Sequence, residues 1–286
     1  MHQVESGWLI GSRGIHGRSA EGWTRLGAGA FGVTAILRRP DGLLVGSEAG
    51  LWQIPAGTDQ WVQWHDETLT LVSDLGQAAT GAGEPTLVAA TGYGVATCRL
   101  DEAGAPRWDW PAADLGPDRR YTNALLIDDD APARWLAGTE AGLYCTENGG
   151  AKWTGTSLVG EPVRALLRAG GSYWAGADSG GVWRSADGLS WAPAGEGLGD
   201  TPVYALAWTG DRLLAGTERG VAQGDGRGPW QLSELPLRVA AVATGRDRWL
   251  AGACPGGLWC SRDMGATWTR DGDFQHVRAI EPPEEE

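Results

Sequence analysis

The chain has little of what membrane-spanning or nucleic-acid-binding proteins need. No apolar run approaches the eighteen or so residues of a membrane-spanning helix. Basic residues are outnumbered, 23 Lys and Arg against 36 Asp and Glu, which gives a formal net charge of −13. Proteins that bind nucleic acid or an anionic membrane require a basic footprint. These absences argue against membrane insertion and against a nucleic-acid partner.

Cysteines are also few, at four, and no two of them form a CxxC pair, so no zinc signature is present. Cys145 and Cys260 follow similar Leu-aromatic pairs in separate copies of the repeat described below, too far apart for a disulfide. We therefore expect small buried thiols in a reducing compartment. The N-terminus enters the repeat at once and leaves no room for a signal peptide, so the expected location is cytoplasmic. We expect neither a metal nor a cofactor.

Tryptophan is abundant by contrast, with 17 residues against two phenylalanines. Seven tryptophans close successive copies of one repeat: Trp23, Trp61, Trp108, Trp153, Trp191, Trp230 and Trp268. Each copy spans about 41 residues and holds short alternating apolar runs bounded by Gly, Asn or Asp, the pattern of strands. We name the four strands of a copy A to D in chain order, with the closing Trp at strand D. The pattern predicts an all-β, seven-bladed β-propeller with four-stranded antiparallel blades.

The two ends of the chain predict how the ring closes. The first copy starts at strand B, Trp8–Gly11, and its missing strand A reappears at Val277–Ile280. We expect the C-terminal strand to complete the N-terminal blade, which removes the open sheet edges. Residues 1–281 are thus predicted to be a single propeller, followed by an acidic disordered tail at 282–286. The acidic run at 128–130 is predicted to be a solvated loop between strands A and B.

The turn before strand D carries a family resemblance. Ser261–Trp268 reads S-R-D-M-G-A-T-W, a full match to the Asp-box, S-x-D-x-G-x-T-W. Near or degenerate copies place Asn148, Asp187 and Asp225 at the position of Asp263. The chain resembles the BNR/Asp-box propellers, which include sialidases, xyloglucan-degrading enzymes, sortilin-type receptors and photosystem II assembly factors, and looks most like the last group. We interpret the four residues as structural, because short polar side chains in tight turns bond to nearby backbone N–H groups.

Antiparallel topology places the B–C turns and D–A loops at one end of the ring, around the mouth of the central channel. We call this end the mouth face. Candidate binding residues in its B–C turns are Arg13, Glu48, Tyr93, Glu140, Asp178, Glu218 and Arg219. The D–A loops add Trp64, His65, Trp110, Arg120 and His276, and the second residues of strands A add Asn123, Arg164, Tyr204 and Arg278. Among the histidines, His65 alone is a candidate acid or base.

Two functions fit this face. The favoured one is a non-catalytic protein-binding or assembly scaffold, because loops on a rigid scaffold commonly carry binding residues. We expect this scaffold to be monomeric by itself. Four of the seven B–C turns carry an acid, which predicts a partner with a basic surface, although each single acid is also explained as a solvated turn residue copied by duplication. The short B–C turns favour the scaffold, since catalytic propellers usually carry long, distinctive loops.

The alternative is a hydrolase or lyase that acts on a carbohydrate or small molecule in a channel-mouth pocket of acids and Trp. Two facing carboxylates are required for glycoside hydrolysis. A sialidase resemblance implies instead an arginine triad, a Tyr–Glu nucleophile pair, an Asp acid and an F/Y-R-I-P motif. The nearest string, Leu37–Pro40, falls at the opposite end of the ring.

Overall fold

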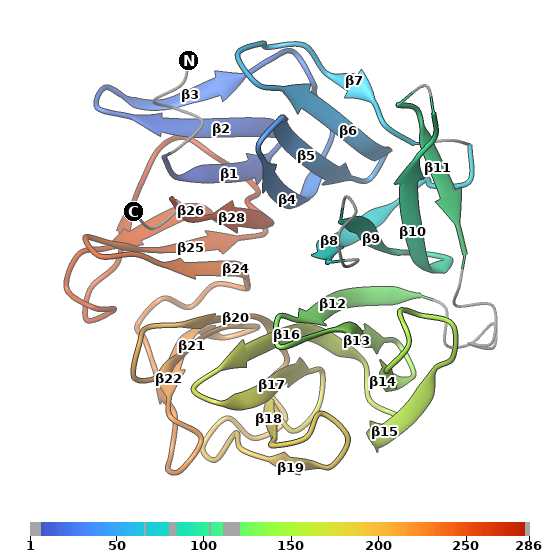
Figure 1. Cartoon of the computed structure of the whole chain (residues 1–286). Helices are drawn as coiled ribbons and strands as arrows, with labels where there is room; N and C mark the ends of the chain where they lie inside the picture. Colours follow the sequence, from blue (N-terminus) through green and yellow to red (C-terminus); the bar gives the residue numbers. More distant parts are fainter. Residues whose placement is uncertain (1–6, 66, 80–84, 103, 111–120, 284–286) are drawn as a thin grey trace.

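The computed structural model describes residues 7–65, 67–79, 85–102, 104–110 and 121–283. These residues form seven four-stranded antiparallel sheets arranged in a ring and contain no helix (Figure 1). The predicted all-β, seven-bladed propeller is therefore confirmed. No helix in the described part of the chain is long and apolar enough to cross a membrane.

The blades follow one another along the chain. Their strands, in the order A to D, are β28 (Ala279–Glu281), β1 (Leu9–Ser12), β2 (Gly14–Ser19) and β3 (Gly22–Leu26) in blade 1; β4 (Val33–Arg39), β5 (Gly42–Ser47), β6 (Gly50–Pro55) and β7 (Val62–Gln63) in blade 2; β8 (Val72–Ala78), β9 (Thr86–Thr91), β10 (Gly94–Leu100) and β11 (Pro106–Asp109) in blade 3; β12 (Thr122–Asp128), β13 (Ala131–Thr139), β14 (Gly142–Thr146) and β15 (Thr154–Val159) in blade 4; β16 (Val163–Ala169), β17 (Ser172–Ala177), β18 (Val182–Ser185) and β19 (Trp191–Pro193) in blade 5; β20 (Val203–Trp208), β21 (Leu213–Thr217), β22 (Gly220–Gly224) and β23 (Gln231–Leu232) in blade 6; and β24 (Val239–Thr244), β25 (Trp249–Ala253), β26 (Gly257–Ser261) and β27 (Thr269–Arg270) in blade 7.

Blade 1 joins the two ends of the chain, as predicted. Strand β28 pairs with β1 in antiparallel register, so that Ala279 lies opposite Gly11. The N–H of Arg278 also donates to the carbonyl of Gly11 at 3.0 Å. Of the predicted acidic tail, the structure describes Pro282 and Pro283, and the carbonyl of Pro282 accepts a hydrogen bond from Arg38. The glutamates at 284–286 lie outside the described residues.

The blades pack on one another through a glycine in strand B and a valine that begins the next blade. An added Cβ on Gly46 would lie 2.8 Å from Cγ1 of Val72, and one on Gly176 would lie 2.6 Å from Cγ1 of Val203. The same contact recurs at four other blade interfaces. Blade 3 differs, because Ala90 stands at its glycine position and the buried Thr122 starts the following blade. The repeated glycines are therefore the space into which the neighbouring valine fits.

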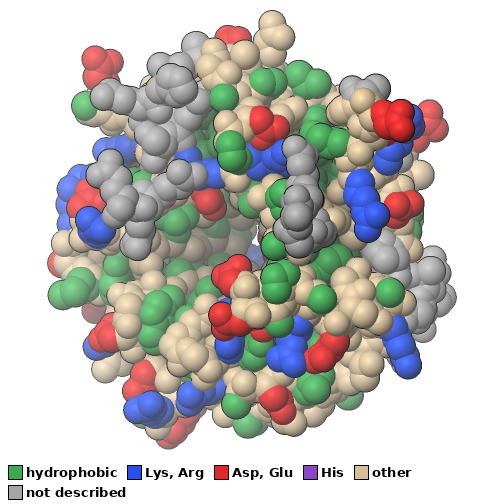
Figure 2. Space-filling model, viewed as in Figure 1, with side chains coloured by type: hydrophobic (Ala, Val, Ile, Leu, Met, Phe, Trp, Pro, Cys, Tyr) green, Lys and Arg blue, Asp and Glu red, His purple; other side chains and the backbone are tan. Residues whose placement is uncertain are grey.

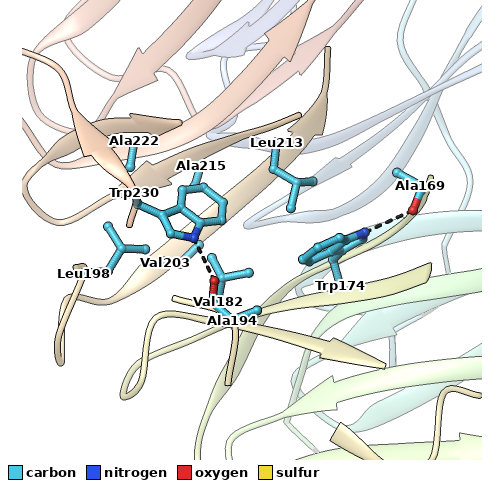
Figure 3. Packing of buried hydrophobic residues seen from close by; sticks show 10 residues of the cluster. All are labelled: Ala169, Trp174, Val182, Ala194, Leu198, Val203, Leu213, Ala215, Ala222 and Trp230. Carbon is cyan, nitrogen blue, oxygen red and sulfur yellow. Dashed lines mark hydrogen bonds between the residues drawn. The ribbon is translucent and has the colours of Figure 1, made fainter. Parts of the chain in front are cut away.

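The closing tryptophans fill the outer part of these interfaces. Trp230 lies in a buried cluster with Leu198 and Leu213, and its indole N–H donates to the carbonyl of Ala194 in the preceding blade at 2.8 Å (Figure 3). Trp61 does the same toward Leu26 at 3.2 Å. Each of these two rings thus buries a large apolar area while its polar N–H is satisfied by the neighbouring blade. The tryptophan position that recurs seven times in the sequence therefore lies at an interface between neighbouring blades.

The prediction of a solvated loop at 128–130 is wrong for its first residue. Asp128 is the last residue of β12 and is buried, with its carboxylate accepting the hydroxyl of Tyr173 from blade 5. Its other carboxylate oxygen accepts the N–H of Asp130, which caps a tight two-residue turn. A buried carboxylate is tolerated here because it is hydrogen-bonded. Its donor belongs to a neighbouring blade, so the local sequence does not reveal the burial.

Candidate functional site

In blades 2 to 7 the second residue of strand A borders a cavity of about 670 Å³ at the channel mouth, and the equivalent residue of blade 1, Arg278, lies immediately before β28. The strands A of these six blades have a register shift at this residue, for example between Val163 and Ala165 in β16. Such a bulge takes one residue out of the ladder and redirects its side chain. The equivalent residues that line the cavity are Thr34, Ser73, Asn123, Arg164, Tyr204, Ala240 and Arg278. The structure therefore brings Asn123, Arg164, Tyr204 and Arg278 together around one cavity.

The acids of the B–C turns form ion pairs with the arginines that line this cavity. Arg164 donates to Asp178 at 2.6 Å and also to Glu140, so two turns hold one guanidinium. These bonds, Asp178 first, raise the pKa of Arg164 above its ordinary value, against the opposing effect of burial. Arg278 pairs in the same way with Glu48 of blade 2. Each of these acids is therefore part of an ion pair, which reduces the charge it offers to an incoming molecule.

Blade 6 adds a tyrosine to this network. The hydroxyl of Tyr204 donates to Glu218 at 2.6 Å, and the guanidinium of Arg238 lies 4.4 Å from the centre of the Tyr204 ring. Arg238 also lies 3.6 Å from the Glu218 carboxylate. Burial, and then the hydrogen bond to Glu218, raise the pKa of Tyr204 to about 12. The phenol is thus held in its protonated form at neutral pH.

Exposed aromatic side chains lie beside the cavity over blade 3. Tyr93 is 62 % exposed and packs edge-to-face on Trp110, with ring centres 6.5 Å apart. Tyr121 is 40 % exposed and also lines the cavity. The space-filling view shows apolar and charged side chains interspersed over one face of the ring (Figure 2). Large exposed aromatics next to a cavity are typical of binding surfaces, since they offer apolar area at a small entropic cost.

Trp64 does not belong to this surface, so its prediction as a binding residue of the mouth face is wrong. Its side chain is 8 % exposed and packs with Leu44 and Leu69 in a core cluster between blades 2 and 3. The guanidinium of Arg39 covers the ring at 5.5 Å. No local pattern signalled this burial, because Trp64 lies only three residues after the closing Trp61 in a segment predicted to be loop.

The histidines of the mouth face have different surroundings. The Nδ1 of His65 lies 3.1 Å from the backbone N–H of Leu51 and 2.6 Å from its carbonyl oxygen, so the ring is tied to strand β6. This makes a positioning role in the B–C turn a better account of His65 than acid–base chemistry. His276 is exposed and lies 3.5 Å from the thiol of Cys254.

Other predicted residues are separate from the central cavity. Arg13 is exposed and, with His276, lines a second cavity of about 390 Å³ between blades 1 and 2. Arg219 is exposed at its turn, and Arg120 lies outside the described residues. The sequence interpretation missed Arg238, Tyr121 and Cys254, all three of which line the central cavity. Arg238 lies immediately before β24, the strand A of blade 7. This position is the sequence signal that could have identified Arg238 as a cavity residue.

The turns before strand D lie at the other end of the blades. Asp263 accepts the N–H of Thr267 at 2.9 Å and the hydroxyl of Ser261 at 2.8 Å. Asn148 accepts from Lys152 and Thr146 with the same geometry, Asp187 accepts from Leu189 and Ser190, and Asp225 accepts from Arg227. These bonds lower the pKa of Asp263 and of Asp187 to about 2. All four side chains hold their own turns.

No group of three or more His, Cys, Asp and Glu side chains within the described ranges has a metal-binding arrangement. No protein-family model matches the chain, and no curated protein matches it in sequence. Solved structures match in fold. The extracellular domain of a putative one-component system from B. thetaiotaomicron superimposes with a TM-score of 0.70 at 17% identity, over 88% of this chain and 36% of that one.

Two further solved structures have the same architecture. The GH74 xyloglucanase from Xanthomonas campestris matches with a TM-score of 0.63 at 18% identity, over 85% of this chain and 45% of that one. The computationally designed Ika8 protein matches with a TM-score of 0.57 at 16% identity, over 86% and 89%. This chain therefore spans less than half the length of both natural proteins. At such identities the likeness establishes the propeller fold alone.

Proposed function

We propose that this protein is a non-catalytic binding module that docks a protein partner on its mouth face. The observation that carries the proposal is the exposed Tyr93, packed edge-to-face on Trp110 beside the cavity. Aromatic side chains of this kind are enriched among the residues that dominate binding energy at interfaces. The resemblance of the D-strand turns to the BNR/Asp-box propellers supports the proposal, because the assembly factors and receptors of that superfamily bind proteins.

The ion pairs of the mouth face also support a binding role over catalysis. A general acid must carry a proton, whereas a guanidinium stabilises the charged form of a carboxylate. Glu140 and Asp178 both pair with Arg164, and Glu48 pairs with Arg278. We retain a partner with a basic surface as part of the proposal, since Glu48 and Glu218 stay exposed despite their pairing.

The test compares two faces of the ring. Immobilised wild-type protein is used to capture partners, beside Tyr93→Ala/Trp110→Ala and beside Met264→Ser, which alters an exposed residue of a C–D turn at the opposite end. A partner retained by wild type and Met264→Ser and depleted by the double variant supports the proposal. Retention by the double variant with loss on Met264→Ser contradicts it. Circular dichroism checks that each variant is folded.

A second candidate function is glycoside hydrolysis, favoured by one specific arrangement. Tyr204 lines a cavity together with Arg164 and two further arginines, and its hydroxyl donates to Glu218. A sialidase-like enzyme would need this Tyr–Glu pairing. The raised pKa of Tyr204 opposes this role, since a phenol nucleophile has to lose its proton. Fluorogenic glycosides with a neutral sugar and with sialic acid are the substrates for the test. Turnover by wild type that disappears in Tyr204→Phe and in Glu218→Gln would establish that the protein is a glycoside hydrolase. Absence of turnover in wild type would favour the binding-module proposal.

We also propose that the protein is monomeric and resides in a reducing compartment, the cytoplasm. Support for the compartment comes from Cys98, Cys145 and Cys260, which are buried in strands of three different blades. Cell fractionation with a tagged full-length chain, and light scattering of the purified protein, test these two points.

A further inference from the structure

The B–C turn of blade 7 differs from the others in its chemistry. Blades 2, 4, 5 and 6 have an acid at the start of this turn, whereas blade 7 has Cys254. Cys254 is partly exposed and lines the central cavity, while the other three cysteines are buried. Burial raises the pKa of the Cys145 thiol to about 11 and raises that of Cys260 as well. One thiol of four is thus accessible from the cavity.

Two side chains from the segment before β28 lie against this thiol. The Nε of Arg278 lies 3.3 Å from the sulfur of Cys254, and the Nδ1 of His276 lies 3.5 Å from it. A guanidinium N–H that donates to sulfur stabilises the thiolate, and an adjacent imidazole can accept the thiol proton. Glu48 engages Arg278 from blade 2 and, as an anion, offsets part of this effect. A partly exposed thiol between a cation and a base is the arrangement of a reactive cysteine.

The charges of the cavity wall indicate which molecules it admits. Its charged lining residues are three arginines, at 164, 238 and 278, and the single glutamate at 48. Each arginine is paired with an acid, Arg164 with Glu140 and Asp178, Arg238 with Glu218 and Arg278 with Glu48, so the wall carries no net positive charge. The cavity volume of about 670 Å³ suits a small organic molecule. A small disulfide can therefore reach Cys254, and the paired charges of the wall set no strong preference for its charge.

We propose that Cys254, His276 and Arg278 form a thiol–disulfide exchange site that accepts small disulfides. The thiol proton of Cys254 passes to His276. The thiolate then attacks one sulfur of the disulfide, a new S–S bond forms to Cys254, and the old S–S bond breaks. The departing thiolate takes the proton from His276, so the disulfide itself is the oxidant and one small thiol is released. The site is independent of the proposed partner docking, because it requires neither Tyr93 nor Trp110.

Three disulfides of similar size and different charge test the site. They are dithiodiglycolate, a dianion; hydroxyethyl disulfide, which is neutral; and cystamine, a dication. Reaction rates at pH 7 are measured with the native full-length protein and divided by the rates of N-acetylcysteine with the same probes. We expect one modified thiol per chain, located at Cys254 by peptide mass spectrometry. Its normalised rate should be about ten with each of the three probes, since the thiolate fraction of Cys254 controls exchange and the paired charges of the wall set no preference.

Variants separate the chemistry from simple exposure. Cys254→Ser should abolish the fast modification and leave Tm unchanged. Arg278→Gln should slow the neutral probe about tenfold, because the sulfur loses its cationic neighbour. Arg246→Gln, an exposed arginine in the turn between β24 and β25, should leave all rates unchanged. His276→Gln provides a second variant of the cluster and should also slow the neutral probe.

The proposal is overturned if native Cys254 reacts no faster than N-acetylcysteine. Wild-type rates in both Arg278→Gln and His276→Gln would equally contradict it. A failure of this kind leaves the partner-docking proposal untouched, since that proposal is tested with Tyr93 and Trp110.

Discussion

Ile10 of β1 and Ile280 of β28 are direct register partners in adjacent strands of blade 1. The two residues come from opposite ends of the chain, and Ile10 is fully buried. Their pairing makes the ring one continuous structure in which each blade has two neighbours. Stability of the whole ring should therefore depend on the last few residues of strand β28.

Deletion of residues 277–286 should lower Tm strongly, because it removes the strand that pairs with β1 and leaves an open edge in blade 1. Deletion of residues 282–286 should have a far smaller effect, since strand β28 stays intact and the bond from Arg38 to Pro282 is the interaction of the described residues that is lost. Differential scanning calorimetry measures both. Equal Tm values for the longer deletion and the full chain would refute this closure.

Gly46→Ala should destabilise the protein by about 1 to 3 kcal/mol, because the new methyl group collides with Val72 of the next blade. In the double variant Gly46→Ala/Val72→Ala the collision is relieved, so the effects of the two substitutions should be less than additive. Urea unfolding of the four members of the cycle provides the measurement, and strict additivity would contradict the packing account.

Asp263→Ala should lower Tm by a few degrees through the loss of its bonds to Thr267 and Ser261. Asp263→Asn should be milder, because Asn148 makes the equivalent bonds in blade 4. Since the folded pKa of Asp263 is lowered to about 2, its ionic contribution is present above the unfolded pKa of about 3.8 and is lost as pH falls toward 2. Thermal scans from pH 2 to 6 should show this loss in wild type and a smaller one in Asp263→Asn.

His16 should make the protein less stable as pH falls from 6.5 to 4. Burial first, and then the charge of Arg25, lower the folded pKa of His16 to about 4. The unfolded chain, whose histidine has a pKa near 6.5, therefore binds the proton earlier, and protonation favours unfolding in this interval. His16→Trp, which copies Trp52 and Trp259 at the same place in β6 and β26, should flatten the dependence. An unchanged pH profile of Tm between pH 6.5 and 4 in this variant would assign the effect to other groups.

The sequence determined the architecture of this protein because the architecture is local and repeated. Three sequence features each indicate a contact that belongs to the repeat. They are Trp268 and its six equivalents, the glycine in strand B of six blades, and the displaced strand at Val277–Ile280. A repeat reveals such contacts through its period alone. The second positions of strands A could be assigned to the channel for the same reason, since each bulge redirects one residue.

Only the tertiary structure decided what the mouth-face residues contact. Glu140 looks like a solvated turn acid in the sequence, yet it pairs with Arg164 of the next blade. Trp64 looks like an exposed loop residue and is buried, and Cys254 looks like one more inert thiol and lies beside Arg278. The partner of Glu140 and that of Cys254 both lie 24 residues further along the chain, where the next blade begins. Pairing across a blade interface depends on side-chain reach and on the shape of the ring, neither of which a single repeat encodes.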